Sequence, residues 1–297
     1  MEFSQWATAA RQEVDHYLQA ALSARLPAVA GRGDQVLHEA MAYGVLGAGK
    51  RIRALLAMAA GEVTQSERSC CVQVGAAIEC IHAFSLVHDD MPCMDDDALR
   101  RGQPTVHVKY GQAQALLVGD ALQTLGFELL ADLPIAADRV VALFKVMAQA
   151  TGLQGMAGGQ AIDIAAVGRS MDQDALQSMH ALKTGALISA AVEMGALCGR
   201  AGEADLQALR RFAAMVGLGF QVADDVLDVS ADVRTLGKTP GKDAAACKPN
   251  FVALLGLEGA RDYARGLHQR AIAELAPFGG RPGRLLELAS ALIERTH

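Results

Sequence analysis

The sequence predicts an all-α fold, and three observations carry this prediction. Hydrophobic residues make up 52% of the 297 residues and charged residues 20%, a balance that favours a compact core over disorder. Alanine and leucine are abundant and β-branched residues sparse, which favours helices over strands. Apolar residues also recur with helical spacing, as in the stretch 74–84. We therefore expect a single all-helical domain, one large bundle spanning residues 1–297.

Helical periodicity extends along most of the chain. It recurs in the stretches 36–46, 52–60, 112–131, 139–150, 175–198, 205–228, 250–275 and 283–295. Turn signals rich in glycine or proline separate these stretches, among them 31–33, 47–49, 199–202, 239–241 and 279–283. No repeat of fixed period and no long linker divides the chain, so the expectation is about ten helices in one domain.

The composition argues against several classes of function. The net charge of -6 argues against a nucleic-acid partner. The six cysteines match neither a zinc pattern nor a dense disulfide framework, which favours reduced thiols in a cytoplasmic protein. Residues 1–17 lack the pattern of a signal or transit peptide. The longest charge-free stretch, 146–162, holds four glycines and three glutamines, so we expect no membrane span.

The first acidic cluster, residues 89–97, holds five aspartates whose repulsion must be offset by water on a surface or by divalent cations in a site. Asp89 and Asp95 are six residues apart and would point about 120° apart on an ideal helix. Pro92 between them removes a helical hydrogen bond, and a bend or helix end there would bring the two carboxylates together. The alternative is an acidic helix end in which residues 95–97 cap the next helix.

The second acidic cluster ends the apolar stretch 205–228. Asp224 and Asp228 are four residues apart and share a helix face, where like charges destabilise the helix. Their neighbours are apolar, and burying unpaired carboxylates would cost several kcal/mol. A shared metal relieves both problems, whereas a solvated helix end is the alternative. Carboxylates without His or Cys favour Mg²⁺, which also takes phosphate oxygens. The two clusters therefore predict a magnesium-dependent enzyme acting on a diphosphate.

Basic residues stand beside both acidic clusters. The segment 47–53 places three basic residues after a glycine-rich turn at a helix start, as an anion site prefers, although the Walker spacing is absent. Arg100-Arg101 follow the first cluster, Lys183 precedes the second and Lys238 follows it. Each alone also fits a solvated surface charge. Their common placement favours an anionic substrate.

These motifs resemble those of the trans-polyprenyl diphosphate synthases, the family of farnesyl and geranylgeranyl diphosphate synthases. The segment 79–102 is similar to the family's first aspartate-rich motif, in its longer form, and 219–228 is similar to the second. Five further motifs fall in the family's order, namely 50–53, 119–122, 158–163, 183–185 and 236–238. The resemblance implies a helical bundle around a deep central cavity, usually a homodimer.

The resemblance also implies a role for each matching residue. It implies about three Mg²⁺ ions, held by Asp89, Asp90, Asp95, Asp224 and Asp228, with Asp90 supporting and Asp228 acting through water. The allylic diphosphate would be bound by the residues expected to be catalytic, Arg100, Lys183, Thr184, Gln221 and Lys238. Isopentenyl diphosphate would be bound by Lys50, Arg51, Arg53, His82 and Arg101.

The expected reaction begins when the allylic C–O bond ionises, with Mg²⁺ and cationic side chains stabilising the leaving diphosphate. An apolar cavity keeps water from the carbocation, and oxygen dipoles of Thr184 and Gln221 face it. The isopentenyl double bond then attacks, and the released diphosphate takes the proton. In this scheme His82 contacts phosphate, and His88 serves helix packing.

Product length is expected to depend on the helix before Asp89. One helical turn rises about 5.4 Å, close to the length of one isoprene unit. Phe84 stands five residues before Asp89, and Ser85 stands four before it. One aromatic at that place, with the longer first motif, resembles the bacterial farnesyl-type pattern, so we expect Phe84 to limit the product to C15. An ordinary core phenylalanine, with a C10 or C20 product, is the alternative.

Other hypotheses remain open at this point. A terpene cyclase would share the first cluster but needs neither a second aspartate motif nor an isopentenyl site. A non-catalytic subunit that binds prenyl diphosphates would typically lack one aspartate motif. The stretch 111–119 is rich in small residues, which favours a close helix contact and suggests a dimer interface.

Overall fold

The computed structural model describes residues 2–26, 31–47, 49–230 and 249–294. Its helices are α1 (Phe3–Ala24), α2 (Arg32–Leu46), α3 (Ile52–Val63), α4 (Arg68–Asp89), α5 (Val106–Tyr110), α6 (Gln112–Ala131), α7 (Ala137–Thr151), α8 (Met156–Ala166), α9 (Gln173–His180), the π-helical turn η1 (Ala181–Gly185), α10 (Ala186–Leu197), α11 (Glu203–Ser230), α13 (Phe251–Glu274), the 3₁₀ turn η2 (Ala276–Phe278) and α14 (Gly283–Ile293). The described residues include one two-stranded antiparallel hairpin, β1 (Leu99–Arg100) and β2 (Gln103–Pro104). The all-α prediction is confirmed.

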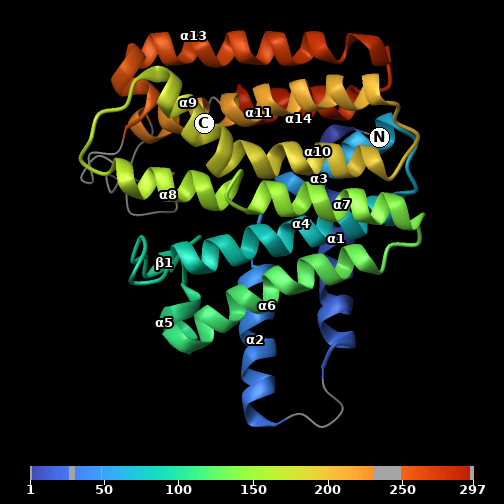
Figure 1. Ribbon diagram of the computed structural model, residues 1–297, viewed down its shortest axis with the longest axis vertical. Coiled ribbons are helices and arrows are strands. Elements are labelled where there is room, and N and C mark those ends of the chain that lie inside the picture. Colours follow the sequence, from blue (N-terminus) through green and yellow to red (C-terminus); the bar gives the residue numbers. More distant parts are fainter. Residues whose placement is uncertain (1, 27–30, 48, 231–248, 295–297) are drawn as a thin grey trace.

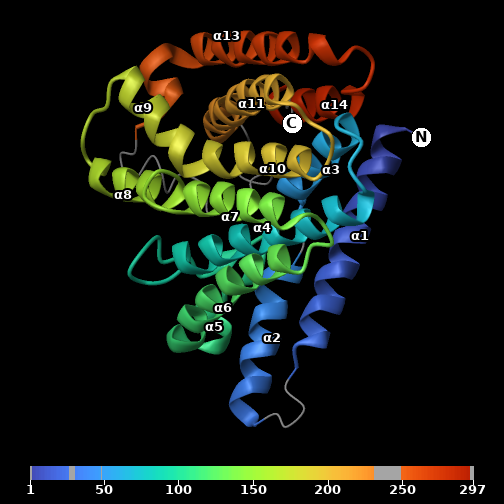
Figure 2. The ribbon, with the colours of Figure 1, turned by 45° about the vertical axis from the view of Figure 1, so that its right-hand side comes forward.

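The helices form layers, with α4 near the middle of the molecule (Figure 1). α4 packs against α1, α2, α3, α6 and α10. At the top of the view in Figure 2, α11 lies beside α13, and α14 packs against both. α1 and α2 cross the remaining helices at a steep angle. This arrangement buries α4 on several sides and brings its carboxyl end to one end of the bundle.

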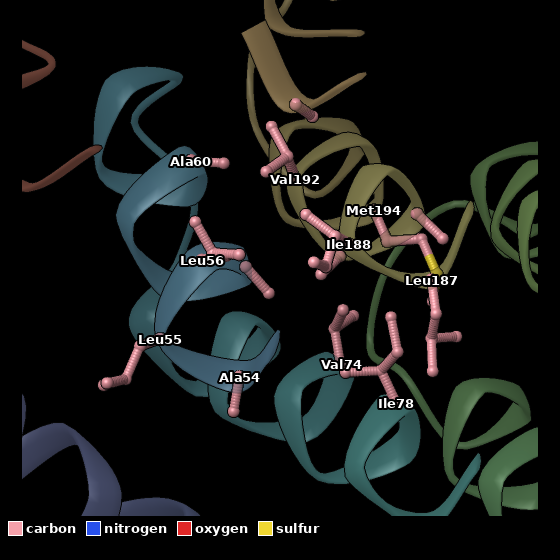
Figure 3. Close-up of a cluster of buried hydrophobic side chains, with 14 of the residues drawn as sticks. Ala54, Leu55, Leu56, Ala60, Val74, Ile78, Leu187, Ile188, Val192 and Met194 are labelled. Atoms are coloured by element: carbon pink, nitrogen blue, oxygen red, sulfur yellow. The ribbon is translucent and has the colours of Figure 1, made fainter. Parts of the chain in front are cut away.

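The core between α3, α4 and α10 is built from aliphatic side chains. Figure 3 shows Leu56, Val74, Ile78, Ile188 and Val192 pointing toward one another from these three helices. Each is at most 1% exposed, and burying such a side chain stabilises the fold by about 1.5–3 kcal/mol. Small residues allow the close approach: a β-carbon at Gly75 would lie 2.9 Å from the Ala54 Cβ. The core therefore holds the first half of α4 in a fixed place.

Several elements differ from the sequence prediction, and among them α5 and α8 lie outside the predicted stretches. The N-terminal helix α1 lay outside the predicted stretches, although Trp6, Ala10, Val14 and Leu18 recur at every fourth position and are buried. The predicted stretch 175–198 is divided by η1, a single π-helical turn. π turns leave the ordinary helical hydrogen-bond pattern and occur often at functional sites.

Within the residues that the structure describes, two segments, Arg68–Asp89 and Ala137–Ala166, are long and apolar enough to cross a membrane by length and composition alone. The apolar window of the first is 72% buried and that of the second 33% buried, so the first is accounted for as a core helix. The expected absence of a membrane span stays a prediction. Five cysteines lie within the described residues, and all are free thiols, in keeping with the sequence.

Candidate functional site

The first acidic cluster begins where α4 ends. α4 stops at Asp89, three residues before Pro92, and the chain then turns back on itself. The Asp95 backbone N–H donates to the Asp89 carbonyl oxygen at 2.9 Å, and the Asp97 N–H donates to the Asp90 carbonyl oxygen at 3.2 Å. The helix end at the proline therefore brings Asp89 and Asp95 together, as the sequence predicted. The alternative, capping of a following helix, is excluded because residues 99–104 form the β1–β2 hairpin.

Asp90 is bound by the hairpin. Arg100 Nε donates to both carboxylate oxygens of Asp90, at 2.9 and 2.8 Å, and Arg100 Nη2 donates to Oδ1 at 2.6 Å. The Asp90 side chain is only 4% exposed. Asp90 thus fixes the Arg100 guanidinium beside Asp89, and its own oxygens are occupied in doing so.

Asp89 lies in a site where its negative charge is disfavoured. Burial raises the pKa of Asp89 to about 6, the nearby Lys183 opposes this rise and Asp95 adds to it. A carboxylate pair with this electrostatics favours a cation. The same interaction places Lys183, which lies 94 positions later in the sequence, beside the end of α4.

Lys183 is carried by the π turn η1 and held from the neighbouring helix α8. Its Nζ lies 2.6 Å from Asp163 Oδ2, and the Asp163 side chain is 8% exposed. α8 also approaches the backbone of η1 closely, since a β-carbon at Gly159 would overlap the Lys183 backbone. Gly159 and Asp163 of α8 therefore together set where Lys183 lies.

The second acidic cluster lies on the last turns of α11. Asp224 and Asp225 are half-buried and Asp228 is exposed, so the expected burial holds for only part of the cluster. Asp225 Oδ2 accepts a hydrogen bond from the Phe251 backbone N–H at 2.8 Å. Gln221 is half-buried one turn earlier on the same helix.

The π turn η1 connects the two acidic clusters. It packs against α11 at Gly217, where an added β-carbon would lie 2.9 Å from the Gly185 Cα. Thr184, half-buried, precedes this contact directly. Lys183 and Thr184 thus lie between the end of α4 and the helix that carries Asp224.

A cluster of positive charge surrounds His82, which lies about two turns before Asp89 on α4. Burial lowers the pKa of His82 well below its usual range, and Arg53, Arg101, Arg100 and Arg51 lower it further. Each arginine remains protonated under physiological conditions. The imidazole is therefore neutral and surrounded by cationic groups.

The positive charge of this cluster is only partly compensated. Burial lowers the pKa of Arg53, and the charge of Glu79 opposes this lowering. Arg53 Nε has no hydrogen-bond partner within the described ranges. Burial also lowers the pKa of Arg101, with Arg51 adding to the effect. Arg51 of this group is buried, Arg53 and Arg100 are half-buried and Arg101 is exposed. A group of guanidinium ions with an unpaired donor favours an anion such as a diphosphate.

Arg51 has a different environment from its neighbours. It is 4% exposed, its Nε donates to Asp15 Oδ1 at 2.7 Å, and its Nη1 lies 3.6 Å from Glu79 Oε2. Its backbone is left-handed, with φ of 50°, directly before α3 begins at Ile52. Arg51 therefore anchors the turn that presents Arg53, whereas Lys50 is exposed.

The expected chain-length residues lie on α4 before Asp89. Phe84 is half-buried, and its ring meets the His88 ring edge-on at 5.8 Å. Ser85 Oγ donates to the His82 carbonyl oxygen at 2.9 Å. His88 Nε2 lies 3.1 Å from the Leu116 carbonyl oxygen of α6, and a β-carbon at Gly119 would overlap its ring. His88 serves helix packing, as the sequence indicated.

The structure brings Asp95, Arg100 and Lys183 to Asp89 at the end of α4, and it brings Arg53 and Arg101 to His82 on the same helix. Lys238 lies outside the described residues. The sequence did not assign Asp163, Glu79 or Asp15 a role, because they pair with Lys183 or Arg51 over 20 to 36 positions and no local pattern connects them. The motif 158–163 was the one available signal for Asp163.

The aspartates fit an open magnesium site better than a metal site that protein side chains enclose. In the part of the chain that the structure describes, no three His, Cys, Asp or Glu side chains gather closely enough to enclose a metal. Mg²⁺ usually keeps waters and takes one or two carboxylates together with phosphate oxygens. Asp89 is half-buried beside Asp95, and its negative charge is disfavoured there, which fits such an open site.

Comparison with known sequences gives consistent results. The family model described as polyprenyl synthetase matches residues 34–275. A probable farnesyl diphosphate synthase of Bradyrhizobium diazoefficiens is 50% identical over 269 residues, 89% of this chain and 81% of that protein. The farnesyl diphosphate synthase of Escherichia coli is 47% identical over 264 residues, 86% of this chain and 88% of that protein.

Solved structures share the whole fold. A farnesyl/geranylfarnesyl (FPP/GFPP) synthase from Zymomonas mobilis has a TM-score of 0.87 and 39% identity, covering 98% of both chains. A geranyltransferase from Helicobacter pylori, complexed with magnesium and isoprenyl diphosphate, has a TM-score of 0.83 and 32% identity, covering 99% of this chain and 97% of that one. Together with the matched motifs, these findings show that the chain belongs to the polyprenyl synthetase family.

Proposed function

We propose that this chain is a prenyltransferase that condenses isopentenyl diphosphate with dimethylallyl and then geranyl diphosphate, head to tail, to give farnesyl diphosphate. One observation carries the proposal: Lys183 lies beside Asp89, while Arg100 adjoins both Asp89 and the guanidinium cluster around His82. A site for one metal-bound diphosphate thus adjoins a site for a second anion. The farnesyl diphosphate synthases among the relatives support the C15 product.

The residues of the allylic site would hold the leaving diphosphate. We assign Asp89, Asp95 and Asp224 as Mg²⁺ ligands, with Asp228 contributing through water and Asp90 orienting Arg100. The magnesium in the Helicobacter pylori relative supports this assignment. Bound Mg²⁺, about three ions, would neutralise charge on the departing diphosphate. Lys183, Arg100 and Lys238 would stabilise the same charge.

The remaining residues would direct the carbon–carbon bond. Thr184 and Gln221 present oxygen dipoles toward the allylic cation, and the expected deep cavity excludes water. Lys50, Arg53, His82 and Arg101 hold isopentenyl diphosphate, with Arg51 fixing the turn that carries Arg53. The isopentenyl double bond attacks the cation, and the diphosphate accepts the proton, so that the residues supply position and charge rather than a nucleophile.

We also propose a cytoplasmic homodimer. Leu116 and Leu117 of α6 are each 49% exposed, next to the small residues at the start of that helix. Such a helix face suits a second copy of the chain. Sedimentation at micromolar concentration tests this: a dimer is expected, and a monomer would exclude it.

The experiment that tests the proposed function is product chromatography with the purified chain. Isopentenyl diphosphate and geranyl diphosphate with Mg²⁺ should give farnesyl diphosphate, and EDTA should abolish it. Cyclic products from farnesyl diphosphate alone would show a terpene cyclase instead. Binding without turnover would show a non-catalytic subunit.

A further inference from the structure

His180, the last residue of α9, is buried without any evident polar reason. It is 7% exposed, and neither of its ring nitrogens has a hydrogen-bond partner among the residues that the structure describes. Its ring lies on the Phe251 ring, with the centroids 5.6 Å apart and an interplanar angle of 27°. A stacked pair uses the flat faces of both rings rather than their polar atoms. The contact of His180 is therefore aromatic.

Phe251 connects this stack to the second acidic cluster. It is the first residue of α13, it is fully buried, and its backbone N–H donates to Asp225 Oδ2 at 2.8 Å. The first N–H groups of a helix have no partner within the helix, and a carboxylate there is favoured by the helix dipole. Asp225 thus fixes the residue on which His180 stacks.

His180 also directly precedes η1, the turn that carries Lys183 and Thr184. Its neighbours include Asp163 and Lys183, and burial lowers the pKa of His180 to about 4. Because the imidazole is neutral, it does not compete with Lys183 for the Asp163 carboxylate. His180 therefore connects its aromatic stack on Phe251 to η1, which carries Lys183 of the proposed diphosphate site.

We propose that Asp225, Phe251 and His180 form a clasp that positions η1, and with it Lys183 and Thr184, relative to the second acidic cluster. In this clasp Asp225 is a positioning residue that acts through the Phe251 N–H, and His180 acts through its ring face. The clasp rests on the proposed function only for its effect on allylic-substrate binding. Its structural part, coupling of η1 to the start of α13, stands independently.

Two matched pairs of variants separate the clasp from other roles. Asp225→Asn keeps an oxygen that accepts from the Phe251 N–H, and Asp225→Ala removes it. His180→Phe keeps the stack, and His180→Ala removes it. Because a lost hydrogen bond of this kind is equivalent to about tenfold, Asp225→Ala should raise the KM for geranyl diphosphate about tenfold. His180→Ala removes the ring contact of the same clasp and should raise this KM by a similar factor. The KM for isopentenyl diphosphate should stay within about twofold.

The conservative variants give the opposite expectation. Asp225→Asn and His180→Phe should stay within about threefold of wild type, because each keeps its contact in the clasp. If Asp225→Asn loses as much activity as Asp225→Ala, Asp225 acts through its charge, as a metal ligand would, and the clasp is wrong. The double variant D225A/H180A should lose no more than either single change, since both break one unit.

Amide hydrogen exchange tests the clasp without any turnover. Asp225→Ala should speed exchange in η1 as well as at Phe251. Asn250→Ala is the control, because Asn250 caps the same helix through the Ala253 N–H at 2.8 Å without belonging to the clasp. Faster exchange at η1 in both variants, or in neither, overturns the proposal. Wild-type protein that makes no farnesyl diphosphate overturns the proposed function and leaves this exchange result standing.

Discussion

Lys183 Nζ lies 2.6 Å from Asp163 Oδ2, and the two side chains are 26% and 8% exposed. This ion pair joins η1 to α8 and holds Lys183 beside the end of α4. Since hydrogen bonds to charged groups contribute about 1.5–3 kcal/mol, Asp163→Ala should lower kcat/KM for geranyl diphosphate about 10- to 100-fold. Asp174→Ala, which removes an exposed carboxylate of α9, is the control and should keep wild-type kinetics. Equal kinetics of the two variants would show that the pair does not position Lys183.

The contact between His88 and Gly119 predicts a stability difference. A β-carbon at Gly119 would overlap the His88 imidazole, so Gly119→Ala must displace His88 and should lower the free energy of unfolding by about 1–3 kcal/mol. Gly266→Ala on α13 meets no described atom within 4 Å and should raise it by about 0.5–1 kcal/mol. Urea unfolding of both variants measures the difference. Stabilisation by Gly119→Ala would contradict the packing described for α4 and α6.

The buried imidazole of His180 predicts a pH dependence of stability. Its folded-state pKa is about 4, against about 6.5 for an exposed histidine, so between these values the unfolded chain binds a proton that the folded chain does not. Stability from this group is therefore present above pH 6.5 and is lost as the pH falls toward 4. Asp163 and Lys183 face the ring and do not remove this effect.

The corresponding measurement compares wild type with His180→Phe. From pH 7 to pH 5 the wild type should lose about 2 kcal/mol more free energy of unfolding than the variant. His82, whose pKa is also lowered, acts in the same direction but is present in both proteins. Identical pH profiles would mean that His180 is not held neutral by burial.

Phe84 predicts the length of the product. If its ring limits the hydrocarbon tail, Phe84→Ala should extend the product from C15 toward C20 or longer, because the removed ring frees about one helical turn of space. Chromatography of the dephosphorylated alcohols measures this. Phe144→Ala, in the Phe127–Phe144 pair between α6 and α7, is the control and should leave the length at C15. An unchanged C15 product from Phe84→Ala would assign Phe84 to ordinary core packing.

Much of the fold could be predicted because helical periodicity is local. α4 and α11 follow from their apolar spacing, and the close approach of Asp89 and Asp95 follows from the helix-ending effect of Pro92. α1 carried the same kind of signal, a buried residue at every fourth position, and could have been predicted from it. Local pattern thus accounts for the elements themselves.

The interactions between elements could not be predicted in the same way. The ion pairs of Lys183 with Asp163 and of Arg51 with Asp15 join segments 20 and 36 positions apart, and nothing in either segment indicates its partner. The π turn at 181–185 has no periodic signature of its own. Arg51 illustrates the consequence: its motif implied a substrate contact, whereas its side chain is buried against Asp15 and Glu79.

The central claim is that Asp89 and Lys183 hold a metal-bound allylic diphosphate whose ionisation starts the reaction. The most direct test is the rate of farnesyl diphosphate formation from saturating geranyl and isopentenyl diphosphates with Mg²⁺, for wild type and Asp89→Asn. Since removing a group that stabilises developing charge costs about 10²–10³ in kcat, Asp89→Asn should be slower by that factor while staying folded. A wild-type rate in Asp89→Asn, or no farnesyl diphosphate from the wild type, would contradict the account.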